Sequence, residues 1–462
     1  SAEDAQKAGT RRATERKEET MRDLTKGSII RLMLLFSLPI LLGSLFQQAY
    51  NLVDIIIVGK KLGELSLSAV GSTTAVVSLM FNIINGLCTG FAIPVAKHYG
   101  ANDMNKVRRT VAGMITYSAI ITAVIMALCI VFVEPLLTAL NTPAEIFEQA
   151  KLYLTIVAGG LIVTLIYNLE ANILRALGDS IVPLIILVIS AVLNVGLDFM
   201  FIFGFGMGVD GAALATVIAQ LISAIVCFVY LIRKCPFLKL GRSDFRLHGE
   251  EIKSLLASGL GMALMYSIVD IGSIVLQNGI NGLGTGIISA HTAARKIFSF
   301  TIMPFSAISA TLVTFVSQNL GAGKFDRIKK SIKYGLLIGY GWSTLAVLIV
   351  YLFGEQLVLM IAPADNREII DTAVNYLRIN VPFYYALNTL LSLRCTLQGL
   401  GKSVVPIGAS LVEMAWKIVT VIAIIPVCGY FGVCISEPII WTASGLLVAV
   451  IAIKTLRAFE KA

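Results

Sequence analysis

Charge is scarce in this sequence. Only 14% of the 462 residues are Asp, Glu, Lys or Arg, and only three are His, whereas soluble globular chains carry about 25% charged residues. This shortage excludes a cytosolic globular enzyme, a disordered chain and a nucleic-acid-binding domain, because each needs a more polar surface. We find no CxxC motif, no HExxH motif and no Ser/His/Asp arrangement, so the sequence predicts neither an enzyme nor a resident cofactor or metal.

Apolar residues fill the chain instead. They make up 57% of the sequence, and the mean hydropathy is +0.84. A membrane-spanning helix uses about 20 apolar residues, so this content allows about twelve spans. The apolar runs are long and unbroken, unlike the short alternating strands of a transmembrane β-barrel. The sequence therefore predicts an all-α polytopic protein of the lipid bilayer.

Twelve apolar runs follow a polar N-terminal tail. Residues 1–23 lack the apolar core of a signal peptide, and we exclude them from the fold. The predicted spans are 30–58, 68–96, 110–133, 150–172, 181–203, 211–232, 253–279, 286–317, 334–353, 369–393, 404–427 and 432–453.

The distribution of Lys and Arg predicts the topology. If the N-terminus lies inside, 29 of the 37 basic residues fall in inner segments, four in outer segments and four within spans. Basic residues concentrate in the cytoplasmic loops of membrane proteins. The bias predicts that both termini are cytoplasmic, and it supports an even number of spans. We expect a multi-pass protein of a bacterial plasma membrane.

The sequence contains an internal repeat. HYGANDMNKVRRT (98–110) reappears as NLGAGKFDRIKKS (319–331), and LRALGDSIVP (174–183) reappears as LQGLGKSVVP (397–406). The offsets of 221 and 223 residues divide the chain into two halves of six helices, which enter the membrane in the same direction. Parallel repeats in transporters place the ligand site near the midplane of the membrane. The predicted domains are the tail 1–23, an N-lobe of helices 1–6 (24–233), a cytoplasmic linker (234–250) and a C-lobe of helices 7–12 (251–462).

The first half carries polar residues deep within its spans. Asp54 and Asp198 are carboxylates in apolar runs, Asn194 precedes Asp198 by one helical turn, and Thr216 lies in the next helix. An ionisable group in the membrane is costly, and it usually faces a cavity or a partner. Two carboxylates in a low dielectric can hold a proton, or they can bind a small hard cation together with neighbouring oxygens. A purely structural role, in which they only bond across helices, stays open at this point.

The second half lacks the carboxylate pair at the equivalent positions. By the repeat offsets, Asp54 corresponds to Val275, Asp198 to Val421 and Asn194 to Lys417. In place of that pair, the spans of this half carry other charged or titratable residues, which are candidates for the lining of a cavity: Asp270, His291, Arg295, Glu413 and Lys417. Glu413 and Lys417 are spaced to pair along one helix, so we expect these charges mainly to neutralise one another. We expect His291 to make a polar contact between helices rather than to relay protons, and Glu170 and Arg175 to be interfacial or gate residues.

The motifs, taken together and in this order, resemble those of the multidrug and toxic compound extrusion (MATE) transporters, nearest to their DinF-like branch. The resemblance spans about Leu24 to Arg457. Besides the repeated loop, the segments in which the resemblance is found are DLTKGSI (23–29), FSLPILLGSLFQQAYNLVDIIIVGKKLG (36–63), ILRALGDSIVP (173–183), LNVGLDFMFIFGFGMGVDGAALAT (193–216) and QGLGKSVVP (398–406).

The resemblance implies twelve helices in two pseudo-symmetric six-helix lobes around a central cavity. It also implies a coupling-cation site in the N-lobe, formed here by Asp54, Asn194, Asp198 and Thr216, with Tyr153 in the fourth helix. Other branches of the family use carboxylates in helices seven and ten. This chain has Asp270 in helix seven, several residues away from the matching position, and no acidic residue over 374–393. That departure favours coupling through the N-lobe alone.

The resulting hypothesis is an antiporter. H⁺ or Na⁺ would bind at the carboxylate pair and enter the cell, and amphipathic, often cationic, organic compounds or drugs would leave in exchange by alternating access. We expect no metal-ion site other than a possible Na⁺ site at this pair. We expect no cofactor, no nucleic acid and a monomer. The alternative is a flippase for lipid-linked oligosaccharides from the same superfamily. That class predicts a longer chain, often with fourteen spans, and a cationic cavity for pyrophosphate.

Overall fold

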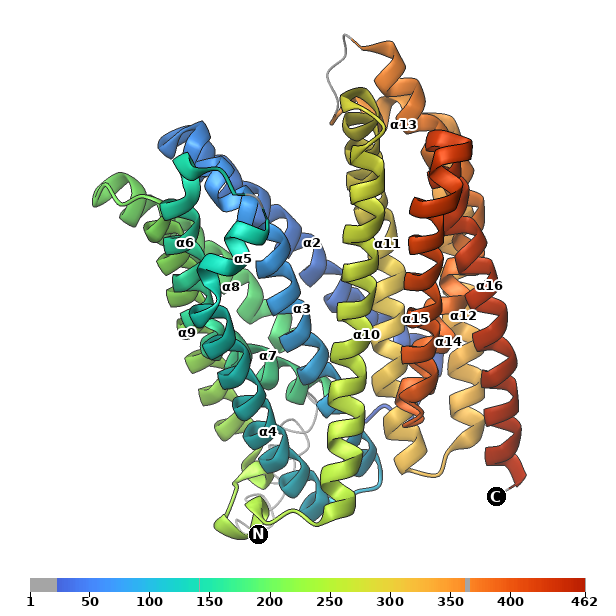
Figure 1. Cartoon of the computed structure of the whole chain (residues 1–462). Coiled ribbons are helices and arrows are strands. Elements are labelled where there is room, and N and C mark those ends of the chain that lie inside the picture. The colour runs from blue at the N-terminus through green and yellow to red at the C-terminus, as the bar shows by residue number, and fades with distance from the viewer. Residues whose placement is uncertain (1–22, 141, 362–365, 462) are drawn as a thin grey trace, which may run out of the picture. The chain divides into compact units, whose positions relative to one another are not determined.

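The computed structural model describes residues 23–140, 142–361 and 366–461, so the predicted tail lies outside the described residues except for Asp23. These segments form helices and short connections (Figure 1). The α-helices are α2 (Ile29–Leu62), α3 (Glu64–Gly100), α4 (Met104–Val131), α5 (Val133–Ala139), α6 (Ala144–Gly159), α7 (Leu161–Ala176), α8 (Ile181–Asp198), α9 (Val209–Lys234), α10 (Gly249–Asn281), α11 (Thr285–Gly321), α12 (Phe325–Leu359), α13 (Arg367–Asn380), α14 (Tyr384–Gly399), α15 (Val404–Val419) and α16 (Ile425–Lys461).

Short helical segments of other geometry interrupt this series. The segments η1 (Phe199–Gly204) and η5 (Thr420–Ile424) are π-helical, and η2 (Pro236–Leu238), η3 (Arg242–Phe245) and η4 (Val381–Phe383) are 3₁₀ turns. Within the described residues, every predicted span coincides with one long helix or with two helices joined at a break. The prediction of an all-α fold with twelve membrane helices is confirmed.

The breaks repeat with the period found in the sequence. The fourth span bends by 43° between α6 and α7, at Gly160. The tenth is interrupted at η4, which contains Pro382, 222 residues later. The π-helical segments begin at Phe199 and Thr420, 221 residues apart. The repeat is therefore a repeat of backbone geometry as well as of sequence.

Glycines with positive φ in the turns between helices also recur with the period of the sequence repeat. Gly63 and Gly284 precede α3 and α11 with φ of 87° and 101°, and Gly206 and Gly429 follow the π-helical segments with φ of 68° and 58°. Residues with a side chain rarely adopt such positive φ values. At Gly429 the backbone is non-helical, with φ of 58° and ψ of −141°, and this kink within α16 separates the eleventh span from the twelfth.

The chain divides into two compact units. Among the described residues, the first unit comprises 23–27 and Leu42–Leu260, and the second comprises Ser28–Leu41 and Gly261 onward. In the first unit α3 and α7 lie at the centre, packed against α4, α6 and α9. In the second unit α11 and α14 are central and contact α12, α13 and α16. The predicted domain boundaries stay a prediction, since this division also assigns the start of α2 to the second unit.

The bend at Gly160 depends on close packing inside the first unit. A Cβ atom added at Gly160 would lie 2.4 Å from Cγ2 of Val217 on α9, much closer than carbon atoms can approach. We predict that Gly160→Ala lowers the free energy of unfolding by about 1–3 kcal/mol, the usual cost of overpacking a core. Val217→Ala in the same chain should recover most of the loss. Thermal unfolding of the purified single and double variants tests this, and equal unfolding temperatures for wild type and Gly160→Ala would contradict it.

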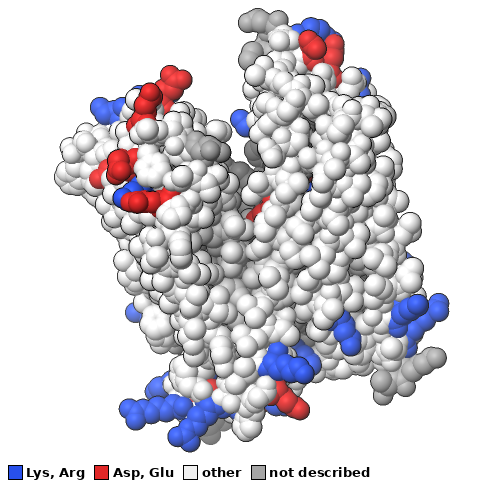
Figure 2. Space-filling model, in the orientation of Figure 1, with Lys and Arg blue, Asp and Glu red and all other residues white. Residues whose placement is uncertain are grey.

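Charges separate along each unit. One end of each unit carries mostly Lys and Arg, and Asp and Glu gather toward the opposite end (Figure 2). The basic ends include the starts of α4 and α12, where Arg108, Arg109, Lys329 and Lys330 lie. Such a separation is typical of membrane proteins with basic cytoplasmic loops. Which side of the membrane each end faces stays a prediction.

Candidate functional site

The first-unit site begins at the end of α8. Asp198 is the last residue of this helix and is fully buried, and Asn194, one turn earlier, is only 3% exposed. The π-helical segment η1 starts directly after Asp198. A π-helical turn changes the helix register, and such turns often occur at functional sites. Here the change coincides with the residue that carries the buried carboxylate.

Three helices bring the predicted residues together. Asn194 Nδ2 donates to Thr216 Oγ1 on α9 over 3.4 Å, and the Thr216 hydroxyl donates to the carbonyl of Ala212 over 3.2 Å. Asp54 on α2 is half-buried, and its carboxyl group lies within hydrogen-bonding reach of Asp198. The structure thus places side by side four residues that are far apart in the sequence.

The oxygen atoms of this cluster lack donors. Asp54 Oδ1, both carboxylate oxygens of Asp198 and Asn194 Oδ1 are buried, and no hydrogen-bond donor of the described residues reaches them. Nor does any Lys or Arg in the described part of the chain form an ion pair with either carboxylate. A buried carboxylate without partners costs several kcal/mol. A proton, a cation or water bound at these oxygens would lower that cost.

Two tyrosines flank the carboxylate pair. Tyr50, one turn before Asp54 on α2, and Tyr153 on α6 both lie within electrostatic range of Asp54 and Asp198. Their hydroxyl groups supply further oxygen atoms that can accept from water or coordinate a small cation. The arrangement can hold a proton shared between two carboxyl groups. It can equally hold a hard cation, because its free atoms are carboxylate, amide and hydroxyl oxygens.

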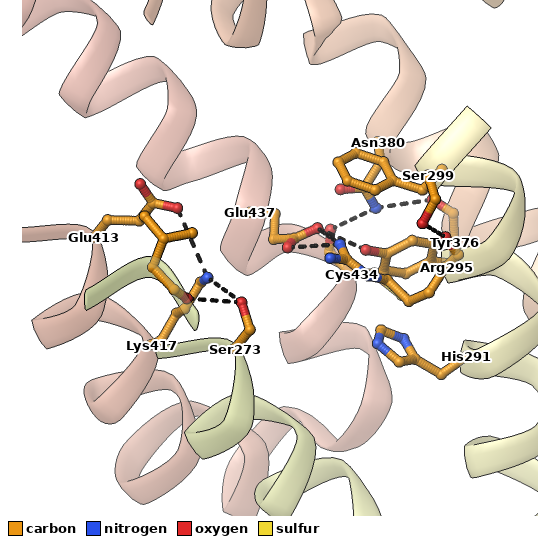
Figure 3. A network of polar contacts seen from close by, with 12 residues as sticks. Ser273, His291, Arg295, Ser299, Tyr376, Asn380, Glu413, Lys417, Cys434 and Glu437 are labelled. Atoms are coloured by element: carbon orange, nitrogen blue, oxygen red, sulfur yellow. Dashed lines mark hydrogen bonds and ion pairs between the residues drawn. The ribbon is translucent and has the colours of Figure 1, made fainter. Parts of the chain in front are cut away.

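The second unit holds a network of charged and polar side chains (Figure 3). Arg295 Nη1 on α11 lies 3.0 and 3.1 Å from the two carboxylate oxygens of Glu437 on α16. The hydroxyl of Tyr376 on α13 donates to Glu437 Oε2 over 2.6 Å. His291 is 4% exposed, and its Nδ1 lies 3.0 Å from the hydroxyl of Tyr430. His291 thus makes a polar contact between α11 and α16.

A second group of charges lies around α15. Lys417 Nζ is 3.7 Å from Glu413 Oε1 along the helix and donates to Ser273 Oγ of α10 over 3.2 Å (Figure 3). Arg394 of α14 lies 3.6 Å from the other oxygen of Glu413. Asp270, one turn before Ser273 on α10, is half-buried and also has an interaction partner. The charges of this group therefore compensate one another.

The two units differ in charge at equivalent positions. Lys417 occupies the place that Asn194 has in the first unit, and Tyr376 occupies that of Tyr153. The second unit pairs the acids Glu413 and Glu437 with bases, whereas Asp54 and Asp198 of the first unit form no ion pair with a basic side chain of the described residues. One backbone scaffold thus carries a neutralised network in one copy and an unsatisfied acidic cluster in the other.

The sequence analysis missed three members of the second-unit network. Glu437 lies in the apolar run CISEPIIW, and this position indicates an acid within the membrane. Tyr376 is the residue of the second half that is equivalent to Tyr153 by the repeat offset. Arg394 lies inside α14 rather than in a loop. Glu170, expected as an interfacial or gate residue, is 5% exposed, and its role stays a prediction.

Comparison with known proteins decides the family. The family model described as MatE matches residues 39–200 and 255–422. These segments cover more than half of the chain, one in each half of the repeat. The chain belongs to the MatE family. The site residues Asp54, Asn194 and Asp198 lie in the first matched segment, and Lys417 lies in the second.

Curated relatives of this MatE protein carry transport names. The chain is 28% identical over 340 residues to the probable multidrug resistance protein YoeA of Bacillus subtilis, covering 72% of this chain and 73% of the relative. It is 24% identical over 343 residues to the multidrug export protein MepA of Staphylococcus saprophyticus, covering 74% and 76%. It is also 25% identical over 341 residues to an FAD transporter of Shewanella oneidensis, covering 72% and 75%.

Solved structures share the MatE fold. An outward-facing multidrug resistance MATE family transporter of the MOP superfamily aligns with a TM-score of 0.87 at 22% identity, over 96% of this chain and 99% of that one. A MOP superfamily transporter from Pyrococcus furiosus, described as having a binding pocket of reversed polarity, aligns with a TM-score of 0.87 at 21% identity, over 95% and 98%. At this identity the likeness concerns the fold.

Proposed function

We propose that this MatE protein is a cation-coupled antiporter that exports amphipathic, often cationic, organic compounds by alternating access. The observation that carries the proposal is the cluster of four buried acceptor oxygens on Asp54, Asn194 and Asp198 without a donor. A membrane protein retains an uncompensated intramembrane acid mainly where it binds an ion or substrate. The names of the curated multidrug relatives support the substrate class.

The carboxylate pair supplies the coupling. When it is free of H⁺ or Na⁺ it is anionic, and it attracts a lipophilic cation. When it binds H⁺ or Na⁺ it is neutralised, so the attraction is lost and the substrate leaves on the other side. Coupling between two ligands typically amounts to about 1–3 kcal/mol, or roughly 5–150-fold in affinity. A change of this size is sufficient to alternate uptake and release.

The network of the second unit has a structural role in this proposal. The close pairs Arg295–Glu437 and Lys417–Glu413 leave little net charge to titrate. Ion exchange therefore belongs to the first unit alone. We infer that the protein works as a monomer, because each chain contains a complete cluster.

Everted membrane vesicles containing the full chain test the proposal. A fluorescent lipophilic cation such as ethidium serves as the probe, and a proton gradient and a Na⁺ gradient are imposed separately. We expect at least one gradient to drive uptake into the vesicles, and dissipating that gradient to stop it. Transport that neither gradient accelerates would contradict antiport and would favour passive or lipid-handling activity.

A further inference from the structure

Glu170 is a buried carboxylate that the coupling cluster does not use. It lies on α7 inside the first unit and is 5% exposed, and no donor of the described residues reaches its Oε2 atom. The thiol of Cys227 on α9 is within hydrogen-bonding reach of its carboxyl group. A cysteine thiol is a weak donor. Glu170 Oε2 is thus unsatisfied, as both carboxylate oxygens of Asp198 are, and no basic side chain in the described part of the chain forms an ion pair with Glu170.

Glu170 and Asp198 lie at different depths of the same helical hairpin. α8 runs for 18 residues from the 178–180 turn to Asp198, whereas α7 needs only six residues from Glu170 to reach Ala176 beside that turn. At a rise of 1.5 Å per residue, Glu170 lies roughly 15–20 Å closer to the turn than Asp198 does. The distribution of Lys and Arg predicts that this turn is cytoplasmic.

Polar groups occupy the interval between the two carboxylates. Tyr50, beside the carboxylate pair, lies within electrostatic range of Tyr167, and Tyr167 in turn lies within range of Glu170. The hydroxyl of Tyr167 donates to the carbonyl of Pro183 over 3.5 Å, a long contact that leaves it able to bond to water. Hydroxyl groups that both donate and accept can pass a proton together with intervening water.

We propose that Glu170 is a second proton-binding site, which receives the proton released by the Asp54–Asp198 pair and passes it toward the 178–180 turn. In this step an O–H bond at Asp198 breaks and an O–H bond at Glu170 forms, so the pair becomes anionic again while Glu170 becomes neutral. Arg175, further along α7 and within electrostatic range of Cys227, favours the later loss of that proton. Cys227 and Tyr167 lie within electrostatic range of Glu170, and Arg175 and the carboxylate Asp179 lie within range of Cys227.

The site selects the coupling ion. One carboxyl group and a thiol offer too few oxygen ligands for a hard metal cation, which takes several oxygens. The inference rests on the proposed antiport and makes it more specific, because only H⁺ can pass Glu170. Na⁺ could fill the outer cluster but could not continue along this route.

The test uses purified full-length protein in liposomes, with ethidium as the probe. Glu170→Gln should slow uptake driven by a proton gradient by about 100-fold, the lower end of the effect of a positioned proton-transfer group. It should leave gradient-free exchange of labelled for unlabelled ethidium at the wild-type rate. Glu170→Asp, which keeps a carboxyl group, should restore much of the driven uptake. Glu134→Gln, which removes an exposed carboxylate paired with Lys151, is the control and should behave as wild type.

Tyr167→Phe provides a second variant that keeps the ring and removes the hydroxyl. It should reduce driven uptake in the same direction and leave exchange intact. Gradient-driven uptake at the wild-type rate in Glu170→Gln would overturn the proposal. Loss of gradient-free exchange in both variants would also overturn it, because that result would show a structural role for the two residues. If Glu170→Gln is unaffected while Asp54→Asn and Asp198→Asn are inactive, the second site is wrong and the coupling assignment stands.

Discussion

Replacing either carboxylate of the pair, by Asp54→Asn or Asp198→Asn, is expected to abolish drug efflux while leaving expression and membrane insertion intact. The amide has nearly the same shape as the acid, but it cannot take up a proton and binds a cation weakly. Because the two carboxyl groups share one site, loss of either removes the switch between anionic and neutral states. Cells that express either variant should be as sensitive to a cationic drug as cells without the protein.

Asp371→Asn is the matched control for this experiment. Asp371 is exposed on α13, and its Oδ1 lies 3.2 Å from Nε of Arg367. An exposed ion pair contributes little to stability, so this variant should confer wild-type resistance. Wild-type resistance in both Asp54→Asn and Asp198→Asn would show that the pair does not couple transport.

Glu437→Gln is expected to have the largest effect on stability. Its side chain is 8% exposed and accepts from both Arg295 and Tyr376. The substitution leaves the Arg295 guanidinium without its counter-charge. Removing one partner of a buried ion pair typically lowers the free energy of unfolding by about 3–5 kcal/mol. Because the Arg295 side chain is 35% exposed, we expect a loss near the lower end of this range. The purified variant should therefore unfold at a clearly lower temperature than the wild type.

Two further variants decide the cause of such a loss. Arg295→Met combined with Glu437→Leu removes both charges, and it should recover most of the stability because no uncompensated charge remains. Glu355→Gln, at an exposed pair with Arg367, should change the unfolding temperature little. An unchanged unfolding temperature in Glu437→Gln would contradict the structural role assigned to this network.

The fold could largely be predicted from the sequence, because the membrane imposes simple rules. Backbone groups in lipid must bond within helices, so runs of about 20 apolar residues identify spans. The repeated loops at 98–110 and 319–331 also indicated the two halves. The π-helical segments were not predictable, since LDFMFIFG and VTVIAI have no sequence signal for i+5 bonding. The assignment of Ser28–Leu41 to the second unit likewise depends on contacts that the sequence does not display.

The first-unit site could be predicted because its carboxylates lie in apolar segments, where an acidic side chain is rare. Asp54 and Asp198 are acids in apolar runs, and each such residue calls for a partner or a ligand. What could not be predicted is which partners they find. The pairing of Arg295 with Glu437, on helices α11 and α16, requires the three-dimensional packing of the second unit. The same holds for Glu170, whose burial depends on how α7 and α9 meet.

Ion exchange at the Asp54–Asp198 pair is the central step of the proposed transport, and substrate-induced ion release measures it directly. Purified protein in weakly buffered detergent solution is mixed with ethidium, and the released H⁺ and Na⁺ are followed with selective indicators. We expect ion release in proportion to bound substrate for the wild type, and none for the Asp54→Asn/Asp198→Asn double variant. Substrate binding by the wild type without release of either ion, or equal release by the double variant, would contradict ion exchange at this pair.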